Sequence, residues 1–378
     1  MSALKTVLMK ELCSIKSGKS DTVNATPDGE YAFFDRSKII KRSSRYLFDC
    51  EALIIAGEGA EFLPKHYLGK FDLHQRAYAL HNFNKDIDVK YLFYYLHHVK
   101  DYFPRVAVGA TVKSLRLRHF EDLPVVLFPL PTQEKIAAKL DAILAEIDKA
   151  TAVAEANAMN SEALFKSYLG SIFSNGGDGW VTKKLQDICE KITDGTHQTP
   201  TYFDEGVIFL SSRNVTSGKV DWERIKYINQ EQHIEMSRRV SPRVGDILLA
   251  KNGTTGVAAI VDKDVIFDIY VSLALLRVKT EVLPEFLLYF VNSPNAKSQF
   301  NKRLKGVGVP NLHLQEIREV EINFPKSLDV QKKLISDIET FRNITAKQKC
   351  MYDNKKDEIR RFKNSILQQA FNGELVKD

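Results

Sequence analysis

The order of apolar and polar positions divides the chain into two kinds of segment, and each kind occurs twice. Residues 1–130 and 178–327 hold short apolar runs separated by turn residues, a pattern typical of strands and loops. Residues 131–177 and 328–378 instead carry apolar side chains every three or four positions, which predicts long helices. We therefore expect the order domain, helix, domain, helix.

Short apolar runs mark the elements expected in each irregular segment. In the first segment they predict strands, and one helix with an aromatic face, at Tyr31–Phe34, Leu53–Ala56, Ala77–Leu80 and Tyr91–Val99. In the second segment they predict the same kinds of element at Val207–Leu210, Ile247–Ala250, Ile266–Leu276 and Pro284–Asn292. The predicted fold class is α+β, with two α/β domains that have strand-rich cores.

The two halves also match residue by residue when the chain is shifted along itself by 194 to 198 positions. The matched pairs are Ala52–Ala56 with Asp246–Ala250, Phe71–Leu73 with Phe267–Ile269, Tyr91–Tyr95 with Phe286–Phe290, Gly109 with Gly306, Leu115 with Leu312, and Gln133 with Gln331. Collinear matches at a slowly drifting offset indicate a duplicated unit. Two copies in one chain suggest a pseudo-twofold molecule, which suits a twofold ligand such as duplex DNA.

The two helical stretches share one apolar seam. Its members in the first stretch are Ile136, Leu140, Ile143, Ile147, Ala150 and Ala154, and a shift of 198 gives Leu334, Ile338, Phe341, Thr345, Gln348 and Tyr352. Prolines precede both stretches, and each would form a helix about 60 Å long. We expect the two helices to pair as an antiparallel coiled coil; the alternative is that each packs on its own domain or on another protein.

Composition limits the class of protein without naming it. The 378 residues are 44% hydrophobic and 27% charged, with a net charge of +6, which is compatible with a polyanionic partner. Four scattered cysteines predict reduced thiols. We find no run of 18 apolar residues and no charged-then-apolar leader, so we expect a cytoplasmic protein without a membrane partner.

Sequence motifs of catalysis are missing from the chain. It has no G-x-x-x-x-G-K-[ST] loop for nucleotide phosphates, no Asn-Pro-Pro-Tyr run for amino-group methylation and no H-E-x-x-H metal spacing. We therefore expect no catalytic residue, no bound metal and no cofactor on this chain.

The helix ends and one loop carry residues that resemble a known family. Ser365–Val376 is similar to the closing signature of type I restriction-modification specificity subunits, and Tyr168–Gly176 is its internal counterpart. Phe128–Ile136 resembles the start of the family's first conserved helix, and Asp187–His197 resembles the opening of many of its target-recognition domains. The start of the second helix, Pro325–Gln331, departs from the usual compact proline-rich form.

This resemblance covers essentially the whole chain and implies a DNA-reading adaptor without catalytic activity. Two target-recognition domains would each read one half of a split, asymmetric sequence in double-stranded DNA. The paired helices would separate the domains and seat two methyltransferase subunits, which use S-adenosylmethionine. A motor-nuclease subunit, which uses ATP and magnesium, could join the complex.

Candidate DNA contacts come from basic, amide, hydroxyl and glycine residues in loops, because such groups bind phosphates and base edges. In the first domain they are Arg36, Lys38, Lys41, Arg42, Gly57, Gly59, His74, Gln75, Arg76 and Lys113. In the second domain they are Thr196, His197, Gln198, Arg213, Asn214, Lys251, Asn252, Thr254, Thr255 and Asn311. The basic residues after Phe34 are expected in one loop.

Each candidate also has a structural alternative. The basic residues after Phe34 could form a solvated loop, and the two glycines could only make a turn. Residues 251–256 could form a plain tight turn, and the cluster Arg238, Arg239 and Arg243 could be merely exposed. Three other functions stay open: a methyltransferase or nuclease with degenerate motifs, a coiled-coil scaffold whose domains bind protein, and an RNA-binding protein.

Overall fold

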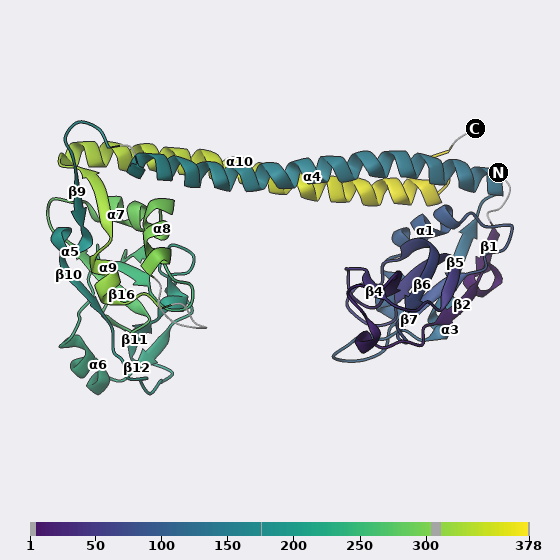
Figure 1. The fold of residues 1–378 in the computed structure, drawn as a ribbon, viewed down its shortest axis with the longest axis horizontal. Coiled ribbons are helices and arrows are strands. Elements are labelled where there is room, and N and C mark those ends of the chain that lie inside the picture. Colours follow the sequence, from purple (N-terminus) through teal and green to yellow (C-terminus); the bar gives the residue numbers. More distant parts are fainter. Residues whose placement is uncertain (1–4, 175, 304–310, 377–378) are drawn as a thin grey trace. The chain divides into compact units, whose positions relative to one another are not determined.

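The computed structural model describes residues 5–174, 176–303 and 311–376. The chain folds into two compact units, residues 1–155 with 353–378 and residues 156–352. Unit 1 holds the first repeat, unit 2 holds the second, and each contains part of both long helices (Figure 1). Gly306, which the sequence matches to Gly109, lies outside the described residues.

The first repeat is built on a six-stranded sheet with the order β2-β7-β5-β6-β3-β4. The strands of this repeat are β1 (Lys5–Leu8), β2 (Ser14–Ser17), β3 (Tyr31–Phe34), β4 (Lys41–Ser43), β5 (Phe48–Ala56), β6 (Lys65–Leu73), β7 (Ala77–His81) and β8 (Pro124–Leu127). Its helices are η1 (Met9–Glu11), η2 (Thr22–Asn24), α1 (Val89–His98), α2 (Tyr102–Val106) and α3 (Leu117–Glu121). The predicted strands and the predicted helix at Tyr91–Val99 are confirmed.

The second repeat has a similar element order. Its strands are β9 (Trp180–Lys184), β10 (Cys189–Asp194), β11 (Val207–Leu210), β12 (Lys226–Ile228), β13 (Ile247–Ala250), β14 (Ala258–Ile260), β15 (Phe267–Ile269), β16 (Leu273–Val278) and β17 (Glu321–Pro325). Its helices are α5 (Leu185–Ile188), η3 (Ser212–Asn214), α6 (Gln230–Ser237), α7 (Pro284–Val291), α8 (Pro294–Arg303) and α9 (Leu314–Arg318).

One strand accounts for the main difference between the repeats. In the first repeat the nine-residue β6 pairs with β5 along one part and with β3 along another. In the second repeat two short strands replace it: β14 pairs with β13, and β15 pairs in parallel with β11. The second repeat therefore has the sheets β10-β16-β13-β14 and β12-β11-β15 where the first has one sheet. The single strand predicted at Ile266–Leu276 is wrong, because it comprises β15 and β16 with a turn between them.

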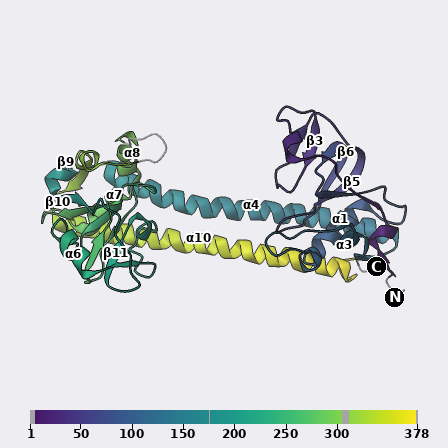
Figure 2. The same cartoon turned by 90° about the horizontal axis from the view of Figure 1, so that it is seen from below.

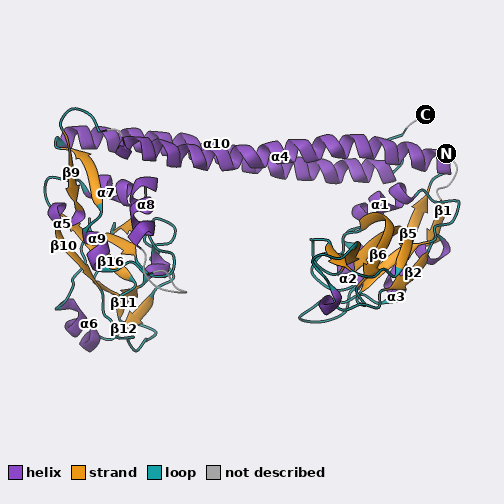
Figure 3. Cartoon of the chain, in the orientation of Figure 1, coloured by secondary structure: helices purple, strands orange, loops and turns teal. Residues whose placement is uncertain are grey.

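Two long helices each contribute to both units: α4 spans Leu130–Ser174 and α10 spans Leu328–Phe371. Both were predicted near these positions. Figures 1 and 2 show α4 and α10 side by side. In Figure 3, α1 lies between the strands of the first repeat and the long helices.

Contacts within each unit confirm that the long helices run antiparallel. In unit 1, Lys139 Nζ donates to the carbonyl of Leu375 at 3.0 Å, and Lys363 Nζ lies 3.2 Å from Asp148 Oδ1. In unit 2, Glu162 pairs with Lys349 and Tyr168 packs on Phe341, so α10 again runs opposite to α4.

The buried line along α4 follows the predicted seam only in part. Its members are Gln133, Ile136, Ala137, Leu140, Leu144, Ile147, Ala154, Ala158, Ser161, Leu169 and Phe173. The predicted members Ala150 of α4 and Gln348 of α10 are exposed. An α-helix drifts by about 20° per heptad relative to a strict seven-residue repeat, so a straight seam cannot stay buried throughout.

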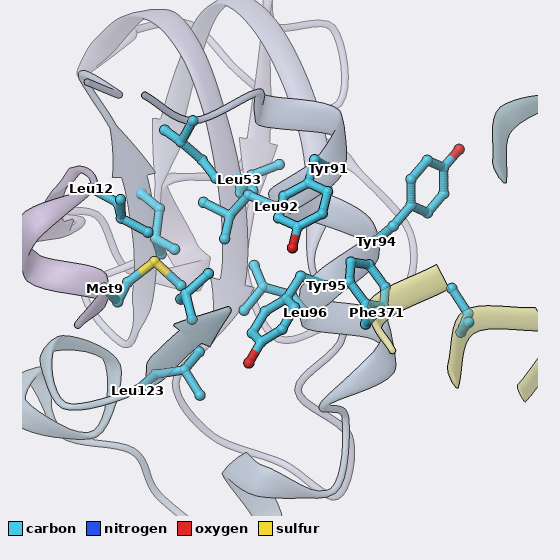
Figure 4. Packing of buried hydrophobic residues seen from close by; sticks show 14 of the residues in the cluster. Met9, Leu12, Leu53, Tyr91, Leu92, Tyr94, Tyr95, Leu96, Leu123 and Phe371 are labelled. Carbon is cyan, nitrogen blue, oxygen red and sulfur yellow. The ribbon is translucent and has the colours of Figure 1, made fainter. Parts of the chain in front are cut away.

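The core of unit 1 lies where α1 packs between the sheet and the end of α10. Met9 and Leu53 belong to this cluster with the aromatic residues of α1 (Figure 4). The ring of Phe371 on α10 lies 5.3 Å from the ring of Tyr91 and 5.2 Å from that of Tyr95. This contact fixes the end of α10 to the first repeat.

Unit 2 repeats this anchoring with the other long helix. The ring of Phe173 on α4 lies 5.3 Å from the ring of Phe286 and 5.3 Å from that of Phe290, both on α7. Each repeat therefore holds the last turns of one long helix against an aromatic face. No described helix of the chain is both long and apolar enough to cross a membrane.

Candidate nucleic-acid interface

A shared set of backbone contacts holds the candidate residues in both repeats. In the first repeat, Gly57 N donates to Arg76 O at 2.7 Å and Leu115 N donates to Gly57 O at 2.7 Å. The second repeat has the equivalent bonds, Lys251 N to Ser272 O at 3.0 Å and Leu312 N to Lys251 O at 2.9 Å. Isolated bridges then join Glu58 to Ser114 and Asn252 to Asn311. We call these contacts the shared frame.

A close backbone crossing completes the shared frame. A Cβ atom on Gly18 would lie 1.9 Å from Leu73 O, and one on Gly195 would lie 1.8 Å from Ile269 O. Only glycine fits at such separations. Parallel bridges beside these crossings bring Ser20 to His74 and Thr196 to Tyr270.

The first repeat brings four candidate residues to one cavity. The cavity has a volume of about 200 Å³ and is lined by Asp21, Thr22, Asp35, Arg36, Glu58, His74, Gln75 and Arg76. The candidates Arg36, His74, Gln75 and Arg76 thus meet, although Arg36 follows β3 and the other three follow β6. A neighbouring cavity of about 530 Å³ adds Lys38 and Gly59.

Carboxylates hold three of the candidate residues of this cavity. Arg76 Nη1 lies 2.7 and 2.9 Å from the two carboxylate oxygens of Glu58, and Gln75 Nε2 donates to Asp21 Oδ2 at 3.1 Å. His74 Nε2 lies 3.7 Å from Asp21 Oδ1. The hydrogen bond from Arg76 is the main reason that the pKa of Glu58 falls below its usual value.

Other candidates of the first repeat have partners within the protein. Lys41 and Arg42 lie on β4 and not in the predicted loop, so that prediction is wrong for these two residues. Lys41 Nζ lies 2.6 Å from Asp35 Oδ2, and Arg42 Nε donates to Gly29 O at 2.8 Å. Gly29 precedes β3 and Asp35 follows it, so these contacts hold β4 to the two loops that flank β3.

Glycine occupies the two candidate positions, 57 and 59, for different structural reasons. A Cβ on Gly57 would lie 2.5 Å from Arg76 O and 2.9 Å from a ring carbon of Tyr78, so glycine is needed for packing inside the fold. Gly59 has a φ of +136° and open space around it, so it serves a turn. Its N–H donates to the carbonyl of exposed Lys113 at 3.1 Å, which keeps Lys113 beside this turn.

The second repeat has a different cavity at the corresponding place. Its volume is about 610 Å³, and its lining includes Tyr202, Phe209, Ser211, Ser212, Arg213, Asn214, Tyr270 and Ser272. Arg213 is exposed, whereas Asn214 is 6% exposed. Asn214 Nδ2 donates to the carbonyls of Asp221 and Arg224 at 3.3 and 2.9 Å, so it stabilises the loop that presents Arg213.

A buried acid organises the loops of the second repeat. Asp194, 2% exposed, pairs with Lys251 Nζ at 2.7 Å, with Arg239 and with His197 Nε2 at 3.3 Å. Burial alone would raise the pKa of Asp194, but the hydrogen bonds from Lys251 and Arg239 lower it below its usual value. Lys251 is 5% exposed and so supports the loop from inside.

The remaining candidates of the second repeat lie on the loops around this acid. Thr254, His197 and Gln198 are exposed, whereas Thr196, Asn252, Thr255 and Asn311 are half-buried. The bridge between Asn252 and Asn311 places two amide side chains together. Val309 and Pro310, the segment that the sequence placed before Asn311, lie outside the described residues.

A family model matches both repeats of this fold. The type I restriction modification DNA specificity domain matches residues 1–156 and 177–350, so each match begins with one repeat and extends into a long helix. The chain belongs to this family.

Relatives of the specificity-subunit family match different shares of the chain. An Escherichia coli type I restriction enzyme EcoDI specificity subunit is 29% identical over 48% of the chain, and the EcoBI specificity subunit of Escherichia coli is 24% identical over 71%. The chain spans 39% and 62% of the lengths of these two relatives. The MjaVIII specificity subunit of Methanocaldococcus jannaschii is 25% identical over 90% of the chain and 83% of its own length.

Solved structures share the fold of this specificity-family chain. A chain in a structure of a type I R-M system has a TM-score of 0.76 at 18% identity, with 99% of both chains covered. The HsdS subunit from Thermoanaerobacter tengcongensis has a TM-score of 0.54 at 17% identity, covering 99% of this chain and 98% of that one.

Sequence reasoning missed the acids that hold the candidate residues in place. Asp21, Glu58 and Asp194 hold candidate donors, and their partners Gln75, Arg76 and Lys251 lie 18 to 57 positions away along the chain. The one sequence signal that pointed to Glu58 was the shared repeat, because it places Glu58 at the position equivalent to the candidate Asn252. Among the residues that the structure describes, no cluster of three or more His, Cys, Asp or Glu side chains could hold a metal ion.

Proposed function

We propose that this chain is the DNA-reading subunit of a type I restriction-modification complex, and that each repeat reads one half of a split, asymmetric site in double-stranded DNA. The observation that carries the proposal is the family match in both repeats, together with a shared frame that presents different side chains in each. Equal frames with unequal side chains fit two different half-sites.

The chain itself carries out no chemistry in this proposal. Its partners are two methyltransferase subunits, which bring S-adenosylmethionine, and motor-nuclease subunits, which bring ATP and magnesium. The chain contributes binding and position, so a methylated adenine would be chosen by the bases that its two repeats contact.

The methyltransferase subunits dock on the long helices in this proposal. A groove of about 680 Å³ in unit 1 supports it, with the apolar residues Ala142, Ile143, Ile147, Ala150, Ile359 and Phe362 between α4 and α10. Phe362 is 53% exposed although it is large and apolar. A large exposed apolar side chain in a groove is typical of protein interaction sites.

Methyl transfer to duplex DNA tests the proposal directly. We expect no transfer from S-adenosylmethionine with the purified chain alone or with the methyltransferase alone, and transfer when the two are combined. DNA binding by the assembled complex should fall steeply with salt, because bound phosphates release counterions. Transfer by the chain alone, or transfer by the methyltransferase without the chain, would contradict the proposal.

A further inference from the structure

Arg76 and Glu58 form an ion pair in the lining of the first-repeat cavity. Arg76 uses Nη1 for both carboxylate oxygens, at 2.7 and 2.9 Å, and Ser114 Oγ donates to Glu58 Oε1 at 3.1 Å. The side chain of Glu58 is 16% exposed, whereas that of Arg76 is 63% exposed. The acid is therefore fixed within the protein, and the guanidinium extends from it toward solvent.

The pair leaves one edge of the guanidinium available. Within residues 5–174, 176–303 and 311–376, neither Nε nor Nη2 of Arg76 has a hydrogen-bond partner. These two groups are parallel donors on one side of a rigid, planar fork. Such an edge fits two adjacent acceptors, and O6 and N7 of guanine are adjacent acceptors in the major groove.

The ion pair is not needed to build the shared frame. The second repeat forms the same frame with Asn252 in the place of Glu58 and Ser272 in the place of Arg76. A structural role alone therefore does not account for the charged pair in the first repeat. The first repeat has a charged pair where the second has uncharged side chains, at a position where the two repeats would read different bases.

The surroundings of Arg76 favour a base over a phosphate. Three carboxylates, Asp21, Asp35 and Glu58, line the same cavity. Carboxylates repel a phosphate, which carries a full negative charge, more strongly than they repel the partly negative acceptor edge of a base. Gln75, beside Arg76, adds an amide that can donate and accept.

We infer that Arg76, positioned by Glu58, reads a guanine through its free Nε and Nη2 edge, so that one half-site contains a G·C pair at a fixed position. This inference rests on the proposed DNA-reading function and assigns a base to one residue of it. Glu58 acts as a positioning residue, since it fixes the plane of the fork without touching the base.

The test uses the complex of the full chain with its methyltransferase and a library of random duplex DNA. Bound sequences are selected and sequenced for the wild type, Arg76→Gln and Arg76→Lys. We expect both variants to lose discrimination at a single G·C position by roughly 10- to 100-fold and to keep the other positions. Arg105→Gln removes the same charge from an exposed site on α2 and should leave the selected sequence unchanged.

The variant Glu58→Gln tests the positioning role. We expect it to weaken the preference at the same G·C position and at no other, with unchanged thermal unfolding. An unaltered preference in Glu58→Gln would overturn the positioning role. An unaltered preference in Arg76→Gln, or an equal loss of affinity for all sequences, would overturn the base contact.

The selected sequences distinguish failure of the proposed DNA-reading function from failure of the guanine contact by Arg76. If the wild-type complex selects no sequence at all, the proposed function is wrong. If it selects a sequence that both Arg76 variants leave unchanged, the proposed function stands and only the assignment of guanine to Arg76 is wrong.

Discussion

Lys251 and Gly57 occupy the same position of the shared frame, but their surroundings differ. In the first repeat a Cβ at Gly57 would lie 2.5 Å from the carbonyl oxygen of Arg76 and 2.9 Å from a ring carbon of Tyr78. The repeat places the smaller Ala274 where Tyr78 stands, and the second repeat holds a lysine side chain at this position. Lys251 uses this room to reach Asp194, a buried acid at the end of β10.

Removing Lys251 should therefore destabilise the second repeat. Because Lys251→Met leaves Asp194 buried with one cation fewer, we expect the free energy of unfolding to fall by about 3 kcal/mol. Urea denaturation of the full chain measures this. Lys219→Met, at an exposed position, is the matched control and should change little. Equal stability of the two variants would contradict the structural role of Lys251.

The same pair gives a pH dependence with a defined sign. The pKa of Asp194 in the folded chain lies below its ordinary value of 3.8. The pair thus contributes its full stability above that ordinary value and loses it as the pH falls through the lowered pKa. We expect stability to decline less steeply below pH 4 in Lys251→Met than in the wild type.

At the scale of residues, the sequence predicted positions better than roles. The repeat matched Gln133 with Gln331, and both side chains are fully buried at equivalent positions. Lys251 was a candidate contact because lysine binds phosphate, and its partner Asp194 lies 57 positions away. Periodicity describes neighbours along the chain, so it cannot assign a pair that forms only when β10 and β13 lie in one sheet.

At the scale of elements, one buried glutamine joins the start of each long helix to its repeat. Gln133 Nε2 donates to the carbonyls of Asp86 and Phe128 at 2.9 and 2.8 Å, and its Oε1 accepts from Asp88 N at 3.0 Å. In unit 2 the matching bonds join Gln331 to Glu281 O, Pro325 O and Leu283 N. Both glutamines are fully buried.

Replacing either glutamine should loosen the join between helix and repeat. Gln133→Leu and Gln331→Leu each leave three backbone groups without a partner, so we expect a loss of roughly 3 kcal/mol in unfolding free energy. Thermal or urea unfolding measures it, and Gln348→Leu, at an exposed position of α10, is the control. If all three variants unfold alike, the amide bonds are not structurally important.

The elements themselves were largely predictable, with two informative failures. Seam periodicity and flanking prolines predicted α4 and α10, since both signals are local. The run Ile266–Leu276 is mostly apolar because β15 and β16 are both buried, and it contains no glycine or proline to mark the turn between them. The strand β4 is short and basic, and only its pairing with β3 makes it a strand.

At the scale of the whole molecule, the length of the helices should set the distance between the half-sites. Residues 149–155 of α4 and 356–362 of α10 face each other, since Asp148 contacts Lys363 just beyond them. Deleting both heptads shortens each helix by about 10 Å. We expect the unread gap in the DNA site to shorten by about three base pairs.

The control deletes one heptad from α4 alone, which mismatches the two helices and should abolish methylation at any specific site. A double deletion that methylates with the original gap would show that the helices do not act as a spacer. Both results are read from the sequences around methylated adenines.

Two related repeats that read two different half-sites should direct methylation to a bipartite DNA sequence. The chain is expressed together with its partner methyltransferase in cells, and methylated adenines are mapped across the genome. We expect one motif with two short, unlike halves and a fixed spacer of undefined bases. A continuous motif, a palindrome, or no methylation dependent on this chain would contradict it.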